Sequence, residues 1–249
     1  FFDPAIGVNG DWSPVTSTAG LIEDKRGYMI FVRGDRTITL SSSPANTTTL
    51  RIKGTLYQPN DPPPSSTVPA GKFSAVGNPY ASAIDINYMK NNTLFQNLNN
   101  DVVVWDPLMY GSYGYGGYQT LAAANNYEPT AGGTTYYPSG VSSPFIQSGQ
   151  AFFVRSSGSA GTVSFNEQAK ESSDRLVNKF VPFSNRQYFR AGLFTQTGIV
   201  ADGNAVVFDN VFANAIDKDD AVKLNNSGEN FAVARSGKTL SVEARKNVL

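Results

Sequence analysis

The sequence contains no histidine and no cysteine in its 249 residues. Serine-histidine-aspartate triads and cysteine-histidine nucleophile systems are therefore excluded, and so are imidazole and thiolate ligands for metals. Disulfide bonds are excluded as well. Catalysis in this chain would have to come from carboxylates or from a serine-lysine pair, and we expect no enzyme.

The chain also has little charge. Its 20 basic residues balance 20 acidic residues, and charged residues make up 16% of the sequence, compared with about 25% in an average protein. Binding to nucleic acid requires a surplus of lysine and arginine on one face, as does attraction to an anionic membrane. We expect neither partner. Low charge with abundant Asn, Ser, Thr, Gly and Tyr is typical of extracellular β-proteins.

Long hydrophobic runs are missing too. The longest span residues 28–32 and 151–154, far short of the roughly 18–20 residues that a membrane-spanning helix needs, so we expect no membrane insertion. The chain begins at Phe1 without an initiator methionine or a charged and apolar leader. We interpret it as a fragment or a processed product whose targeting signal lies outside this sequence.

Apolar residues recur at every second position, which is the pattern of strands with one buried face. The clearest examples are Leu50, Ile52 and Leu56, then Val163 and Phe165, then Leu240 and Val242. Short strands alternate with Gly, Asn, Pro and Ser clusters, as in sandwiches and barrels. The sequence therefore predicts an all-β protein, a jelly-roll or immunoglobulin-like β-sandwich, with short helices near 88–98 and 167–176.

Two segments resemble each other. Residues 27–33 and 149–155 both begin with glycine and end in an apolar group followed by Val-Arg. Either both are central strands of one sandwich, which we favour, or they mark an internal duplication. In both cases we expect the two segments to pair in one core.

A change of composition near residues 166–186 suggests two domains. The first, residues 1–175, is predicted to be a β-sandwich with Tyr-, Gly- and Asn-rich loop excursions over about 88–148, and no basic residue occurs between Lys90 and Arg155. A further exposed loop with polyproline character is expected at Asp61-Pro62-Pro63-Pro64. The second domain, residues 176–249, is predicted to be another β-domain.

Carboxylates could support glycoside hydrolysis, which needs a pair of them about 5–10 Å apart. No spacing in the sequence singles out such a pair. Asp101 and Asp106 flank a strand-like run, but their odd separation would place them on opposite faces. A carboxylate-dependent glycosidase is therefore a remote alternative.

The densest acidic cluster could form a calcium site, because crowded oxygen ligands in loops suit this ion. Its members are Asp202, Asp209, Asp217, Asp219 and Asp220. They lack the spacing of a calcium-binding helix-loop-helix motif. The interpretation we favour is structural: Asp202 and Gly203 form one turn, and Asp217 and Asp220 bond to the backbone at a second.

A Tyr-rich stretch could bind glycans, because tyrosine and tryptophan rings offer flat apolar faces with a polar edge. The predicted platform consists of Trp105, Tyr110, Tyr113, Tyr115 and Tyr118. The alternative, which we favour, is a loop that packs on its own domain and whose glycines allow its tight turns.

Several phrases occur in an order that resembles a known family. They are residues 27–36, 76–85, 104–107, 146–154, 165–167, 202–208, 217–224 and 240–244. This order is similar to the region that precedes the C-terminal sorting domain in very large Bacteroidetes cell-surface proteins, which are exported by the type IX secretion system. The resemblance implies export, contact with that secretion machinery, and extracellular display in a stalk or adhesin, with no catalytic residues.

Two of these phrases suggest local structure. Asn78 and Pro79 should form a turn after a strand at 72–76, because proline keeps the preceding residue extended. Asp85 should then cap or brace the segment that follows.

The family resemblance also implies that the second module continues past Leu249. We therefore expect the second β-sandwich to be incomplete here. Downstream residues, another surface protein or a copy of the chain would complete it through a β-strand edge. The predicted function is a non-enzymatic cell-surface module, structural or adhesive, that can form part of a filament or other assembly. The alternative is a carbohydrate-binding module.

Overall fold

The computed structural model describes residues 1–17, 19–22, 25–32, 34, 49, 53–58, 61–110, 116–171 and 186–247. The fold is mostly β, with 37% strand and 6% helix, and contains several antiparallel sheets. This confirms the β-rich class expected from the alternating apolar pattern. In the described residues, no helix has the length and apolar composition to cross a membrane.

A four-stranded antiparallel sheet lies at the centre of the first part of the chain. Its order is β4 (Phe73–Gly77), β10 (Ala151–Arg155), β7 (Asp101–Asp106) and β8 (Gly117–Ala122). Both faces of the sheet are buried: Val102 and Val104 pack into one core, and Val103 packs into another on the opposite face. Burial on both faces explains why β10 reads as a continuous apolar run instead of an alternating one.

Smaller elements cover this sheet. A three-stranded sheet consists of β3 (Ser65–Val68), β11 (Gly161–Ser164) and β6 (Phe95–Gln96). Two strand pairs accompany it: β5 (Ile84–Asp85) with β9 (Phe145–Ile146), and β1 (Phe2–Asp3) with β2 (Asp11–Trp12). In the described part of the chain, the helices are α1 (Ile86–Asn91) and two 3-10 turns, η1 (Ala123–Asn125) and η2 (Glu167–Ala169).

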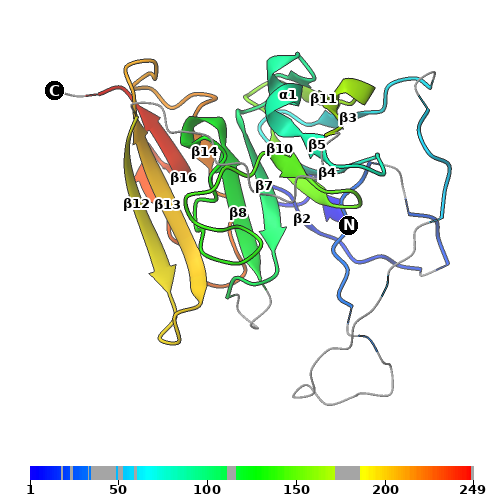
Figure 1. Ribbon diagram of the computed structural model, residues 1–249, viewed down its shortest axis with the longest axis horizontal. Coiled ribbons are helices and arrows are strands. Elements are labelled where there is room, and N and C mark those ends of the chain that lie inside the picture. Colours follow the sequence, from blue (N-terminus) through cyan, green and yellow to red (C-terminus); the bar gives the residue numbers. More distant parts are fainter. Residues whose placement is uncertain are drawn as a thin grey trace.

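The last part of the chain forms a five-stranded sheet beside β8 (Figure 1). Its strands are β12 (Gln187–Phe194), β13 (Val200–Phe208), β16 (Lys238–Arg245), β14 (Ala221–Val222) and β15 (Val233–Arg235), the last paired with β16. The pair β13–β16 is parallel, and the other pairs are antiparallel. Ala122 and Ala124 pack into the core of this sheet, so the two parts of the chain share apolar contacts.

The two similar segments differ in structure. Residues 149–155 supply β10, as expected, whereas the segment at 27–33 contains no strand among its described residues. Arg26, just before this segment, forms a bridge with Val76 on the edge of β4 away from β10, and the Gly27 N–H donates to the Ala75 carbonyl at 3.0 Å. Gly27 then crosses Ala75 so closely that a Cβ on Gly27 would overlap the Cβ of Ala75. Both segments therefore pair with β4, but not with each other.

The predicted loop excursion over 88–148 was wrong in part, because β7 and β8 are central strands of the sheet. The sequence of β8 is polar, yet Gln119 and Thr120 are buried. The following segment bonds to both residues: Gln119 Oε1 accepts the Ala131 N–H, and the Thr120 backbone carbonyl accepts the Thr130 hydroxyl. Local hydrogen bonding thus allows a polar sequence to form a buried strand.

Other expectations have mixed outcomes. The strands expected at 163–165 and 240–242 correspond to β11 and β16. The helix expected near 88–98 is shorter and earlier, as α1, and the one expected at 167–176 begins as η2. Leu50 and Ile52 lie outside the described residues, and the part of 53–58 around Leu56 contains no strand. The predicted domain boundary also falls largely outside the described residues.

Candidate functional site

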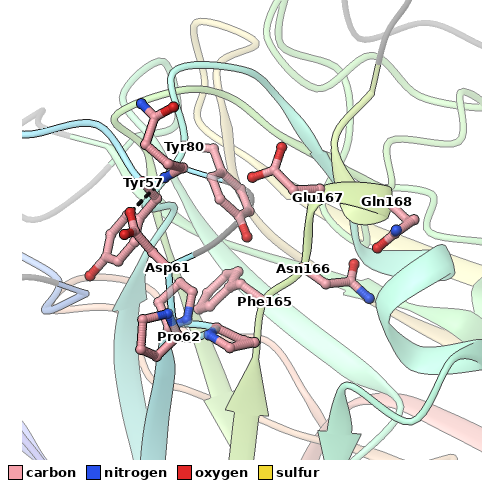
Figure 2. Close-up of a pocket in the computed structure, with 11 residues that line it drawn as sticks. Tyr57, Asp61, Pro62, Tyr80, Phe165, Asn166, Glu167 and Gln168 are labelled. Atoms are coloured by element: carbon pink, nitrogen blue, oxygen red, sulfur yellow. Dashed lines mark hydrogen bonds between the residues drawn. The ribbon is translucent and has the colours of Figure 1, made fainter.

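A pocket of about 230 Å³ opens where the chain enters β3 and leaves β11. These two strands pair antiparallel, with Ser65 opposite Ser164, so the residues just before one and just after the other lie side by side. The Phe165 N–H donates to the Pro64 carbonyl at 2.9 Å and extends this pairing to the pocket floor. The lining residues are Tyr57, Gln58, Asp61, Pro62, Pro63, Pro64, Tyr80, Phe165, Asn166, Glu167 and Gln168 (Figure 2).

Three aromatic rings form the apolar wall. Tyr80 packs edge to face against Tyr57, with 6.5 Å between ring centroids, and against Phe165, with 6.3 Å. Tyr80 and Phe165 are buried and belong to the main core, whereas Tyr57 is half-buried and packs against that core. The wall is therefore continuous with the core, and Tyr57 is its half-buried outer part.

Charged groups surround the Tyr80 ring. The Lys170 ammonium lies 4.3 Å from the ring centroid and 2.6 Å from Glu167 Oε2. Burial, with smaller contributions from the negative charge of Glu167 and from Tyr57, raises the pKa of Tyr80 to about 12. The Tyr80 hydroxyl is therefore neutral at physiological pH and can act as a hydrogen-bond donor.

The polar rim is fixed by two turns. Asp61 Oδ2 accepts the Gln58 N–H at 2.7 Å, and the Asp61 N–H donates to the Gln58 carbonyl at 3.0 Å. On the other side, Asn166 is the N-cap of η2, and its side chain accepts the Ala169 N–H at 3.0 Å. Asp61 and Gln168 are exposed, while Asn166 and Glu167 are half-buried.

Asn78 positions this wall through a clasp of hydrogen bonds. Its Oδ1 accepts the Tyr80 N–H at 3.0 Å, and its Nδ2 lies 2.8–3.2 Å from the carbonyl oxygens of Ser82, Ile146 and Gln147. The side chain is buried. Asn78 therefore makes the turn expected after β4 and also ties it to the chain near β9.

The phrase at 146–154 completes the clasp. The Asn78 N–H donates to the Gln150 carbonyl at 3.0 Å, and the Ser148 hydroxyl donates to the Tyr80 carbonyl at 3.1 Å. Asp85 caps α1 as expected, accepting the N–H groups of Asn87 and Tyr88 at 2.8 and 3.1 Å. Two phrases that are far apart in the sequence thus meet in space and hold the same turn.

The predicted glycan platform is not assembled by the described residues. Trp105 and Tyr118 are cross-strand neighbours on β7 and β8, and their rings meet at 77°, edge to face. Tyr118 is buried, its hydroxyl accepts the Trp12 indole N–H at 2.8 Å, and burial raises its pKa to about 12. Tyr110 is 41% exposed, and Tyr113 and Tyr115 lie outside the described residues.

The five aspartates of the predicted calcium site have separate partners. Asp202 lies within β13, not in the turn that we expected with Gly203, and its Oδ1 accepts the Lys223 ammonium at 2.6 Å. Asp209 pairs with Arg186, and Asp219 accepts the amide of Asn100. The described part of the chain contains no group of three or more acidic residues arranged to hold a metal ion.

The turn at Asp217 and Asp220 is as expected. Asp220 Oδ2 accepts the Asp217 N–H at 2.8 Å, and Asp217 Oδ1 accepts the Asp219 N–H at 2.9 Å. Asp220 Oδ1 also accepts the Ala244 N–H from β16, and burial raises the pKa of Asp220. These carboxylates accept hydrogen bonds from backbone N–H groups, as expected from the structural interpretation of the acidic cluster.

Asp101 and Asp106 lie at the two ends of β7, on opposite faces of the strand as their spacing predicts. Both are buried. Asp106 accepts the Thr134 hydroxyl at 2.6 Å, whereas Asp101 lies opposite Arg155 on β10 and burial raises its pKa to about 7. The two carboxylates do not converge on one cleft.

Sequence reasoning missed the pocket residues Tyr57, Tyr80 and Glu167. A partial signal existed in the proline run beside Asp61, which was expected to be an exposed loop. Nothing local connects that run with Tyr80 or Phe165, because the pocket depends on the pairing of β3 with β11.

No curated protein and no solved structure matches the chain. A protein-family model described as Domain of unknown function (DUF8693) matches residues 2–204. This match includes β1 to η2 and continues into β13. Since it covers well over half of the sequence, the chain belongs to this family of unknown function.

Proposed function

We propose that the chain is a non-enzymatic structural module of an exported cell-surface protein, part of a stalk or adhesin. The main support comes from the hydrogen bonds made by residues in the phrases that carry the family resemblance. The polar groups of these residues form a turn at Asn78, a helix cap at Asp85 and a bond between segments at Gln150. Residues with such roles maintain a shape, as a scaffold requires, and leave the surface loops free to vary.

The same proposal includes a sandwich architecture for the first part of the chain. Val76, Val102 and Phe152 of the four-stranded sheet share one core with Val68 of β3 and Val163 of β11. Two sheets that bury their facing side chains in a common core are the basis of a sandwich. The shared core supports this arrangement.

Assembly through a strand edge is part of the proposed role. In the described residues, β12 pairs only with β13 and is the end strand of its sheet. Phe189 and Phe194 on this strand are 59% and 56% exposed. An extended strand with exposed aromatic residues is suited to pair with a strand of another surface protein or of a second copy.

Surface display can be tested in the source organism with an antibody raised against the purified chain. Intact cells should bind the antibody and should lose the epitope on brief protease treatment, while a cytosolic control protein stays protected. Deletion of the type IX outer-membrane translocon should abolish surface labelling. Labelling that requires cell lysis in the wild type would contradict the proposed location.

Assembly can be tested separately by light scattering of the purified chain over a concentration series. We expect self-association that Phe189→Lys reduces, because a charge on an edge strand opposes pairing. Asn87→Lys on the exposed surface of α1 is the matched control. The same measurement is repeated with proteins extracted from the cell surface of the source organism. A chain that stays monomeric at all concentrations, alone and with these proteins, would contradict the proposed edge contact.

A further inference from the structure

We propose that the pocket between Tyr57 and Glu167 binds one uncharged sugar unit, either free or at the end of a glycan. This site is distinct from the Tyr-rich platform considered from the sequence, and it goes beyond a purely structural role. Figure 2 shows Tyr57, Asp61 and Pro62 on one side of the hollow, Asn166, Glu167 and Gln168 on the other, and Phe165 below.

The apolar wall offers flat faces at the mouth of the pocket. Tyr57 is half-buried, and Pro62 and Pro63 are exposed. The Tyr57 and Tyr80 rings meet at 82°, so they are not stacked face to face. A pyranose ring has one face rich in C–H groups, which packs favourably against such apolar surfaces.

The rim supplies the hydrogen-bonding groups that hydroxyls need. Gln58 and Gln168 have exposed amide side chains, and Asp61 keeps its Oδ1 at the rim while Oδ2 holds the turn. Amides donate and accept, and carboxylates accept, so together they match hydroxyl groups that do both. An entirely apolar ligand would leave these groups without partners.

Charge narrows the choice of ligand. Two carboxylates, Asp61 and Glu167, line the pocket, which disfavours an anion. A cation would be expected to bind the face of Tyr80 and pair with Glu167, but Lys170 already makes both of these contacts. The protein's own ammonium group thus takes the cation position and leaves the space at Tyr57 to an uncharged ligand.

Size sets the number of sugar units. The volume of about 230 Å³ lies below the range of about 300–1,000 Å³ that is usual for sites of drug-sized ligands. The pocket therefore fits one unit instead of an oligosaccharide. A ligand with about a dozen non-hydrogen atoms is expected to bind with a Kd on the order of 1 mM.

The test is saturation-transfer NMR of the full chain with a set of methyl glycosides. The probes are methyl glucoside, galactoside, mannoside, fucoside and N-acetylglucosaminide, each at a concentration of about 10 mM, several times the expected Kd. Choline chloride and sodium glucuronate are the cationic and anionic probes. We expect transfer to at least one methyl glycoside, and none to glucuronate.

Variants locate the site. Tyr57→Ala should weaken binding of the active glycoside about tenfold, as expected for the loss of a ring that packs against the ligand, whereas Tyr57→Phe should retain most of it. Tyr136→Ala is the matched control, because Tyr136 is an exposed tyrosine that does not line the pocket. The melting temperature of each variant shows whether the fold is retained.

Asp61→Asn adds a readout that does not depend on the Tyr57 ring. An asparagine can still accept the Gln58 N–H, so the turn is kept and only the charge is lost. Binding of an uncharged sugar should fall less than tenfold, whereas a cation would lose most of its affinity. The proposal is overturned if no glycoside binds, if choline alone binds, or if Tyr110→Ala or Tyr136→Ala abolishes binding while Tyr57→Ala does not.

Discussion

Two apolar clusters differ in the size of their side chains. The first is the core around the four-stranded sheet, and the second is the contact between that sheet and the five-stranded sheet. The first contains large side chains such as Phe152, Ile84, Met89 and Leu121, all completely or almost completely buried. The second has five alanines among its eight buried residues. It is supplemented by ion pairs, among them Arg190 with Glu128.

This difference indicates two sources of stability. Burial of apolar area contributes roughly 25 cal/mol per Å², so large side chains stabilise the first core most. Alanine buries little area but lets backbones approach, and the polar groups around it then carry more of the contact. Arg186 shows this: its guanidinium donates to the carbonyls of Ala123 and Ala124 and pairs with Asp209.

The largest effect is expected from Phe152→Ala in the first core. The side chain is completely buried, so its removal should lower the free energy of unfolding by about 3–5 kcal/mol through lost transfer energy and a residual cavity. Urea denaturation followed by circular dichroism measures the loss. Tyr136→Ala is the control, because Tyr136 is an aromatic residue that is 56% exposed. Equal losses for the two variants would contradict the assignment of the core.

Asp101 on β7 tests the four-stranded sheet through the pH dependence of stability. It is buried, and its Oδ1 accepts no hydrogen bond from the described residues. Burial raises its pKa from 3.8 to about 7, although Arg155 and Asn99 favour the charged form. Between these two values the folded state binds more protons than the unfolded state. The contribution of Asp101 therefore lowers stability as pH rises from about 4 to about 7, by at most about 4 kcal/mol.

Asp101→Asn should remove this pH dependence. Urea denaturation at several pH values between about 4 and about 8 compares the two proteins, and the difference curve isolates the contribution of residue 101. The variant should gain stability relative to the wild type as pH rises. A difference that stays constant with pH would show that Asp101 keeps an ordinary pKa in the fold.

Lys223→Met tests an ion pair within the part of the chain that forms the five-stranded sheet. Lys223 and Asp202 are buried partners 2.6 Å apart, and loss of the ammonium leaves a buried carboxylate without its counter-charge. The expected loss is about 3 kcal/mol, at the lower end for such pairs, because Asp202 still accepts the Phe231 N–H. Adding Asp202→Asn to the variant should recover most of the loss. A single variant as stable as the wild type would contradict the role of the pair.

The sequence predicted the strands best where a local pattern coincides with a tertiary contact. The strand pattern identified β11 and β16, and the proline after Asn78 marked the end of β4. It failed for β8, whose polar residues are buried only because the segment around Thr130 bonds to them. It also failed for 28–32, an apolar run that the described structure does not form into a strand.

The candidate site was harder to predict than the fold. Aromatic residues close in sequence suggested a platform, but strand pairing buries Tyr118 in a core and packs Trp105 against it. The pocket instead combines Tyr57, Tyr80 and Phe165, which only the tertiary fold brings together. Short-range patterns report turns and caps such as that at Asp85, and long-range pairing decides which rings meet.

The smallest expected loss of stability concerns the clasp at Asn78. Asn78 follows β4 of the four-stranded sheet, and the clasp depends on hydrogen bonds. In Asn78→Asp, Oδ1 can still accept the Tyr80 N–H, while the amide donor is replaced by an oxygen facing the carbonyls of Ser82, Ile146 and Gln147. Lost bonds and repulsion should cost about 2 kcal/mol near neutral pH. Asn87→Asp on the exposed side of α1 is the control. Because protonation restores a donor, the loss should shrink in acid, and a loss independent of pH would mean that the turn is held by its backbone alone.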